Sequence, residues 1–332
     1  MTIQRGKMNL SVYKIESNPH ADKLELLEDA TAKAAMPICE AETIPDGISI
    51  GFASGKILLD RTINADNSII DGYVTLNVRS TAKKIDAGML KALIQCEEAA
   101  YMKARNTEFV PRIERNRIKE EAIERLMKDA KLSVKGTEIV IDGDRLLIGA
   151  TSERDCGTVC DLIAKDLGIV PEWKKHTDAK GETFGAGREF LTWLFTTVQS
   201  GAELPGDVKA MIEGPLELFA PDTEDYPDCA KAKIEGGTVV NSVELNTMLD
   251  QKKHIRKAKL SLVRGEDAWR FTFDADAWNF SGLELPKDCK TFADRIQAIR
   301  ELYDEMEKLF AAWKLAQASE LGIVELPNME KK

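Results

Sequence analysis

Short stretches of this chain alternate between apolar and polar residues, which is the pattern of strands with one buried face. The strands that this alternation predicts are 8–15, 48–53, 57–59 and 73–78. An Asn-Pro pair at 18–19 favours the start of a helix, with Leu24, Leu27 and Ala34 near one face. We therefore expect an N-terminal α+β region over residues 1–85.

A charged helical arm is expected at 86–131. Asp86 is a good cap for its first helix, Pro111 interrupts the helical pattern, and Asn116 can cap a second helix. The expected apolar stripes are Met89, Leu93, Cys96 and Ala100, flanked by Leu90 and Ile94, and then Ile118, Ala122 and Leu126. Mixed charge on the other faces is usually only a solvated surface.

Strands return after the arm. An Asp-Gly turn predicts a β-hairpin at 137–150. Ser152 is placed to cap a helix that stops at Gly168, and 172–188 is polar and loop-like. We expect residues 132–185 to pack with the N-terminal region.

The last part of the chain, 186–332, is expected to form a C-terminal α+β domain. The block 188–199 is apolar nearly all round and predicts a buried helix. Stacking of its aromatic residues on nucleic-acid bases is the minor alternative. The other elements predicted here are a strand at 216–219, a helix at 242–249, a hairpin at 252–273 and a long helix at 292–318.

The hairpin at 252–273 has two unlike faces, because successive side chains of a strand point to opposite sides. The residues of its polar face are Lys257, Lys259, Ser261, Arg270 and Thr272. The residues of its apolar face are Ala258, Leu260, Leu262, Trp269, Phe271 and Phe273. Such a hairpin can pack on a core with one face and hold cations outward with the other.

Positive charge is concentrated in one segment of an acidic chain. Five of the eight residues from Lys252 to Lys259 are Lys or Arg, whereas the 332-residue chain has a formal net charge of −10, so that the rest sums to −15. A local positive field on an acidic protein indicates a surface that meets a polyanion. The alternative is that these lysines only protect a strand edge from unwanted pairing.

The sequence shows no pattern typical of an enzyme. A phosphate-binding P-loop, a dinucleotide-binding fingerprint and a nucleophile elbow are all missing. The six cysteines and three histidines lack the spacing of metal ligands, so we expect no metal and no cofactor. An Mg²⁺-dependent nuclease remains an alternative to a plain surface loop, because carboxylates followed by lysines can form such a site. These residues are Asp222, Glu224, Asp225, Asp228, Lys231 and Lys233.

The chain also lacks the features of an exported or membrane protein. No apolar run approaches the length that spans a bilayer. No apolar region follows the first residues as it would in a secretory signal. We expect a cytoplasmic protein without membrane association.

The order of the elements from Ala87 onward adds a further indication. A charged arm is followed by the hairpin, by a capped helix ending Asp166-Leu167-Gly168, by a Leu-Thr-Trp-type helix at 191–193, and by a basic segment that runs into Ala258-Lys259-Leu260-Ser261-Leu262. A long helix then closes the chain. In order and pattern, over most of its length, the chain resembles the recombination-associated protein RdgC family.

The resemblance implies a DNA-binding protein without catalysis. Its expected fold is α+β, with antiparallel sheets, packed helices, a protruding arm and a horseshoe-shaped monomer that closes into a dimeric ring. Such a homodimer surrounds double-stranded DNA without sequence preference and limits RecA-dependent recombination, which implies a nucleoid-associated location. Binding of single-stranded DNA stays open. A scaffold that binds a protein partner and ignores DNA is the second alternative.

Two sets of site residues are expected. The DNA-binding residues are Lys252, Lys253, Arg256, Lys257, Lys259 and Arg270, helped by Arg112, Arg115, Arg117 and Lys119 of the arm. Contacts between such cations and phosphates give affinity without reading sequence. The resemblance aligns the arm tip, and with it a dimer contact, with 126–131. The residues of that contact are Leu126, Met127 and Lys131.

Overall fold

The computed structural model describes residues 2–15, 23–37, 48–183, 185–220, 231–236 and 242–322. They group into two units. Unit 1 comprises Met1–Lys23, Ile69–Thr75 and Glu138–Lys332, and unit 2 comprises Leu24–Ser68 and Leu76–Thr137. Helices and antiparallel strands occur in both units, which confirms the predicted α+β class.

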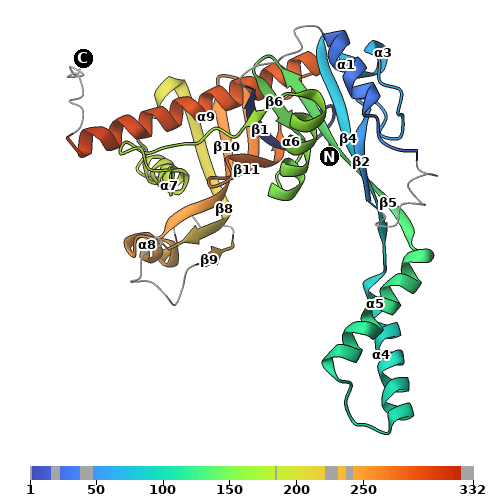
Figure 1. Cartoon of the computed structure of the whole chain (residues 1–332). Helices are drawn as coiled ribbons and strands as arrows, with labels where there is room; N and C mark the ends of the chain where they lie inside the picture. Colours follow the sequence, from blue (N-terminus) through green and yellow to red (C-terminus); the bar gives the residue numbers. More distant parts are fainter. Residues whose placement is uncertain are drawn as a thin grey trace, which may run out of the picture. The chain divides into compact units, whose positions relative to one another are not determined.

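Unit 1 is built on an antiparallel sheet (Figure 1). Its strands run in the order β6-β1-β12-β11-β10-β8-β9, and β7 pairs with the end of β1. Their bounds are β1 Met8–Ile15, β6 Arg145–Ile148, β7 Pro171–Glu172, β8 Val208–Phe219, β9 Lys231–Ile234, β10 His254–Arg264, β11 Asp267–Asp274 and β12 Asn279–Glu284. β4 (Tyr73–Lys84) and β5 (Lys131–Asp142) each run from one unit into the other. The short β3 (Ile69–Ile70) pairs with β4, and the end of β5 pairs with β6 in the predicted hairpin.

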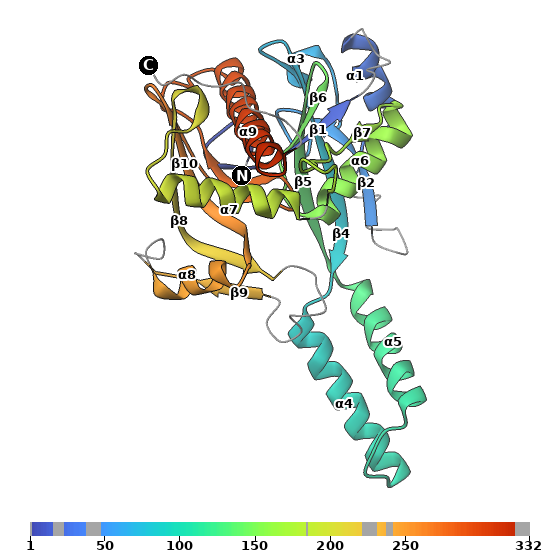
Figure 2. The ribbon, with the colours of Figure 1, turned by 90° about the vertical axis from the view of Figure 1, so that its left-hand side faces the viewer.

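Two helices, α7 (Ala186–Gln199) and α9 (Phe292–Glu320), cover one face of the sheet in unit 1 (Figure 2). The inward-facing residues of β10 and β11 pack there in a single core with both helices. Trp269 of β11 is 1% exposed, and its indole Nε1 donates a hydrogen bond to the Ala298 carbonyl of α9 at 3.0 Å. The hairpin therefore packs its apolar face against the core, as its alternating sequence predicts.

Helix ends in unit 1 follow the capping residues of the sequence. Ser152 accepts a hydrogen bond from the backbone N–H of Asp155 and caps α6 (Glu153–Leu167), which ends at Gly168 in the left-handed conformation. Ser242 likewise caps α8 (Val243–Asp250). A short 3₁₀ turn at Pro205–Asp207 leads into β8. These caps confirm the helices predicted at 152–168 and 242–249.

Gly187 in the first turn of α7 lies against the backbone that follows β11. A Cβ atom added there would collide with the carbonyl oxygen of Ala275. We expect Gly187→Ala to lower the free energy of unfolding by about 1–3 kcal/mol, because the packed backbone has no room to move. Urea unfolding measures this change. Gly157→Ala in α6 is the matched control, since its Cβ would meet nothing within 4 Å, and it should instead stabilise by up to about 1 kcal/mol. If Gly187→Ala raised the free energy of unfolding, this would contradict the close approach of Gly187 to the Ala275 backbone.

Unit 2 combines a small group of elements with the helical arm. α1 (Lys23–Ala32) and the short α3 (Ala65–Ser68) accompany β2 (Ile48–Ser54), which pairs antiparallel with β4. The arm consists of α4 (Ala87–Arg105) and α5 (Arg112–Lys128), which lie side by side beyond the ends of β4 and β5 (Figure 2). Asp86 caps α4 by accepting a 2.8 Å hydrogen bond from the Met89 backbone N–H, as predicted.

Several local predictions in unit 2 are wrong. Residues 57–59 form a turn rather than a strand, and Ile57 and Leu59 are exposed. Of the predicted helix face, Leu27 is buried together with Leu26 and Ala30, but Leu24 is exposed and Ala34 lies beyond the end of α1. The helix start predicted at 18–19 lies outside the described residues.

The stripe predicted for the first arm helix is also wrong in phase. α4 has no buried residue, and Met89, Cys96 and Ala100 point to solvent. Its half-buried apolar residues are Leu90, Leu93, Ile94, Tyr101 and Met102. The second stripe is confirmed, since Ile118 and Ala122 are buried, but α5 starts after Pro111, which places Asn116 inside the helix. Among the described helices none has both the length and the apolar character needed to cross a membrane.

Candidate nucleic-acid interface

The expected DNA-binding hairpin places three cations on one side of the sheet in unit 1. β10 and β11 pair antiparallel, with Lys259 opposite Thr272 and Ser261 opposite Arg270. Ala258, Leu260 and Leu262 alternate with the β10 cations and are buried in the core. Lys257, Lys259 and Arg270 therefore share the side away from α7 and α9, which we call the cationic face. Lys259 and Arg270 are exposed, and Lys257 is half-buried.

Carboxylates from neighbouring strands pair with most of these cations. On β8, Glu213 lies opposite Lys259, and its carboxylate is 2.8 Å from the Lys259 Nζ. Lys257 lies 3.2 Å from Asp274, which also contacts Arg256 at 3.4 Å. The cationic face is thus partly neutralised within the chain. The Lys259–Glu213 pair is exposed on both sides, and because such pairs are worth only about 0–1 kcal/mol, a phosphate can compete for Lys259. Asp274, the partner of Lys257, is only 5% exposed.

Two carboxyl groups near the cationic face have lowered pKa values. The hydrogen bond and charge of Lys259 lower the pKa of Glu213. A hydrogen bond from Lys7 lowers the pKa of Glu284, with smaller contributions from Arg270 and Lys259. Both carboxylates therefore stay ionised at neutral pH, and the cations lie close enough to act together.

A second group of cations surrounds Phe219 at the end of β8. The Cζ atoms of Arg188 and Arg256 lie 4.9 and 5.0 Å from its ring centroid, and the Nζ of Lys231 lies 5.6 Å from it. Arg188 holds Asp276 through two hydrogen bonds of 2.7 and 2.8 Å, and Arg256 approaches the same carboxylate at 3.1 Å. Arg256 is therefore fixed by aspartates and a phenyl ring rather than projecting into solvent.

The first two lysines of the basic segment do not belong to β10. Lys252 is exposed in a turn with a φ of 60°. Lys253 is only 6% exposed, so its side chain would have to move to reach a phosphate. His254 follows at the start of the strand, and burial together with the charge of Arg188 lowers its pKa. His254 consequently adds no positive charge near neutral pH.

The cations expected from the arm lie in unit 2. Arg115 pairs with Glu98 across the two helices at 3.0 Å, and Arg117 pairs with Glu114 and Glu121 of its own helix at 2.8 and 3.1 Å. Hydrogen bonding to Glu114 raises the pKa of Arg117. Arg112 and Lys119 are exposed. The convergence of these residues with the cationic face on one cavity stays a prediction.

The expected dimer-contact residues lie at the base of the arm. Leu126 and Met127 are in the last turn of α5, and Lys131 is the first residue of β5. The turn that joins the two helices, residues 106–111, is at the opposite end. The placement of 126–131 at the arm tip is therefore wrong, because the chain returns to the sheet there. A dimer contact through these residues stays a prediction.

The carboxylates considered for Mg²⁺ binding, at 222–228, lie outside the described residues. Within the described ranges, no three His, Cys, Asp or Glu side chains gather into a group that could hold a metal ion. Cys156 and Cys160 are free thiols on α6. Burial raises the pKa of both, that of Cys160 to about 12, so neither is a reactive thiolate.

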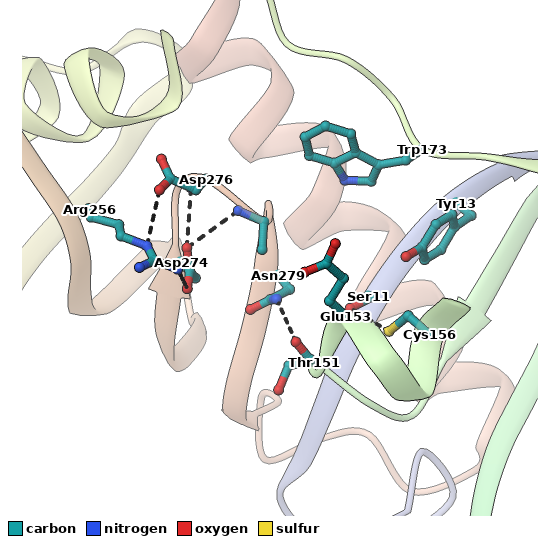
Figure 3. Close-up of a pocket in the computed structure, with 11 residues that line it drawn as sticks. Ser11, Tyr13, Thr151, Glu153, Cys156, Trp173, Arg256, Asp274, Asp276 and Asn279 are labelled. Atoms are coloured by element: carbon teal, nitrogen blue, oxygen red, sulfur yellow. Dashed lines mark hydrogen bonds and ion pairs between the residues drawn. The ribbon is translucent and has the colours of Figure 1, made fainter. Parts of the chain in front are cut away.

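A pocket that the sequence did not predict lies beside the cationic face, also in unit 1. It has a volume of about 520 Å³ (Figure 3). Trp173 and Tyr13 stand on one side, Arg256 with Asp274 and Asp276 on the other, and the carboxylate of Glu153 lies between them. The sequence signal that could have indicated this pocket is Trp173, a tryptophan in the polar, lysine-containing stretch 172–188. By contrast, Phe190 and Phe195 of α7 are buried, which leaves no base-stacking role for them.

The chain matches no protein-family model and no curated protein.

Proposed function

We propose that this protein binds double-stranded DNA without sequence preference and without catalysis. The observation that carries the proposal is the cationic face, on which Lys257, Lys259 and Arg270 share one side of a rigid β-hairpin. Lysine and arginine held on strands can meet phosphates along a duplex, and phosphate contacts carry no sequence information. The acidic remainder of the chain would repel DNA elsewhere.

The assembly proposed for this activity follows the resemblance to the RdgC family. A homodimeric ring would surround the duplex, with the cations of the arm adding to the cationic face. DNA inside such a ring cannot be coated by a RecA filament, so recombination is limited by occupancy. Such an activity would be carried out on the nucleoid, in the cytoplasm.

A comparison of the affinities for two unrelated duplexes tests the proposed function. Fluorescence anisotropy should give equal affinities for two labelled duplexes of different sequence, and DNA should remain intact with or without Mg²⁺. Binding should weaken as salt rises, because phosphate contacts release counterions. Absence of binding at low salt would favour the scaffold alternative, and cleavage in Mg²⁺ would favour the nuclease alternative.

Glu213 is expected to hold back DNA binding, because it competes with phosphate for Lys259. Glu213→Gln should raise duplex affinity by about two- to fivefold, the worth of an exposed ion pair. Anisotropy titrations at low salt measure the change. The matched control is Glu266→Gln in the exposed hairpin turn, which alters net charge equally without touching Lys259. Equal gains in both variants would contradict a local role for Glu213.

A further inference from the structure

A hollow of about 260 Å³ lies on the cationic face itself, around a small side chain. Ser261 of β10 has Met211 of β8 opposite it on one side and Arg270 of β11 opposite it on the other. Along β10 its neighbours on the same face are Lys259 and Val263, because every second side chain of a strand points the same way. All four neighbours are larger than serine, so they surround a depression.

The polar part of this hollow consists of hydrogen-bond donors that can reach an anion. The Arg270 side chain is exposed and makes no ion pair or hydrogen bond with the described residues, and the same holds for the Ser261 hydroxyl. Lys259 has only its exposed pair with Glu213, at 2.8 Å. A guanidinium can donate two parallel hydrogen bonds to a phosphate, and a hydroxyl can donate one more. The hollow therefore offers a phosphate two cations and a neutral donor.

The remaining part of the hollow is apolar. Met211 is 58% exposed, and Val263 and Ala268 lie opposite each other one step further along the hairpin from Ser261. Glu213, the one carboxylate in the lining, lies opposite Lys259, on the side of Ser261 away from Val263. The side chains of the apolar part offer no hydrogen-bond partner to whatever lies against them.

A nucleic-acid backbone has the same division into polar and apolar parts. Each of its phosphates is joined to a sugar on either side, so a phosphate held by Lys259, Ser261 and Arg270 brings a sugar toward the apolar part. Deoxyribose presents only C–H groups at its 2′ carbon, whereas ribose presents a hydroxyl there. A hydroxyl that loses water against apolar side chains without gaining a partner costs free energy. The hollow therefore fits deoxyribose better than ribose.

We propose that this hollow holds one backbone phosphate together with the deoxyribose attached to it, so that the cationic face prefers DNA to RNA. The site rests on the proposed function, because it lies on the face that carries duplex binding. It assigns roles to two residues outside the expected DNA-binding set. Ser261 donates a hydrogen bond to the phosphate, and Met211 forms the main apolar contact with the sugar.

Filling the hollow tests the phosphate position. Ser261→Leu should exclude one phosphate, which weakens duplex DNA binding about tenfold, the worth of one charge-assisted hydrogen bond. The slope of log affinity against log salt should become shallower by about 0.9, and Arg270→Gln should give the same change in slope without added bulk. The matched control is Ser281→Leu, since Ser281 is a half-buried serine opposite Thr272 on the same face and does not line the hollow. Its slope should equal that of the unaltered chain.

Duplexes of one sequence in three backbone chemistries test the sugar contact. Anisotropy titrations should show that DNA binds about fivefold more tightly than RNA, the lower end of the cost of an unpaired hydroxyl. A duplex of 2′-fluoro RNA keeps the RNA-like helix but lacks the hydroxyl, so it should bind as tightly as DNA. Met211→Gln offers the 2′-hydroxyl a partner of similar length and should remove most of the preference, whereas Ser281→Leu should leave it unchanged.

These results separate the hollow from the cationic face as a whole. An unchanged salt slope in Ser261→Leu or Arg270→Gln, or an equal change in Ser281→Leu, would overturn the phosphate position. If 2′-fluoro RNA bound as weakly as RNA, helix geometry rather than the sugar contact would set the preference. Equal affinity of the unaltered chain for DNA and RNA would likewise overturn the role of Met211. In each of these cases duplex DNA binding would still stand, whereas absence of any duplex binding at low salt would overturn both the hollow and the proposed function.

Discussion

Replacing Lys257 and Lys259 together with Glu is expected to weaken duplex binding about 100-fold. Each lysine is proposed to donate a charge-assisted hydrogen bond to a phosphate, and two such bonds at about 1.5 kcal/mol each correspond to this factor. The loss should be the same for every duplex sequence, because phosphates are common to all of them. Anisotropy titrations at constant salt measure the affinities.

The control for this pair must change the net charge equally. Lys165→Glu with Lys287→Glu does so, since both lysines are exposed and belong to neither β10 nor β11. This control should change affinity only slightly. A similar loss in both double variants would mean that overall charge, rather than the cationic face, determines binding. Urea unfolding checks that the double variant still folds. We expect it to fold, because Arg256 still compensates the charge of Asp274 when Lys257 is replaced.

Trp269→Ala is expected to lower the free energy of unfolding by about 3–5 kcal/mol, as for other buried large-to-Ala changes. Trp269 is 1% exposed in the core that joins β11 to α9, and its Nε1 satisfies the Ala298 carbonyl. Its removal leaves a cavity and removes this hydrogen bond. Urea unfolding monitored by circular dichroism measures the loss.

Two comparison variants separate these contributions. Trp269→Phe keeps most of the ring but loses the hydrogen bond, and should cost less, about 1–3 kcal/mol. Trp173→Ala removes an exposed indole and should change stability by only about 0.5 kcal/mol. If Trp269→Ala were as mild as Trp173→Ala, the packing of α9 on the sheet would be wrong.

The fold of unit 1 was predictable where one face of an element is buried. The alternation of β10 and β11 was interpreted correctly, because burial of Leu260 and Phe271 leaves only one register for the cations. The second apolar stripe of the arm was correct for the same reason. α4 buries no residue, so its sequence pattern did not determine which side faces α5.

The carboxylates that pair with the lysines of the cationic face were harder to predict from the sequence. Asp274 lies opposite Lys257 in the same hairpin, and the hairpin register alone could have found this pair. Glu213 comes from β8, which is 46 residues away along the chain from Lys259. A pair of this kind can be predicted only when the order of the strands in the sheet is known. β12 was missed as a strand because the turn before it, with Trp278 at a positive φ, and Gly282 inside it interrupt the pattern.

The salt dependence of duplex affinity tests the central claim most directly. Each phosphate neutralised by a cation contributes about −0.9 to the slope of log affinity against log salt on duplex DNA. If Lys257 and Lys259 each neutralise one phosphate, the slope of the Lys257→Glu, Lys259→Glu variant should be shallower than that of the unaltered protein by about 1.8. Identical slopes would contradict contact between these two lysines and DNA.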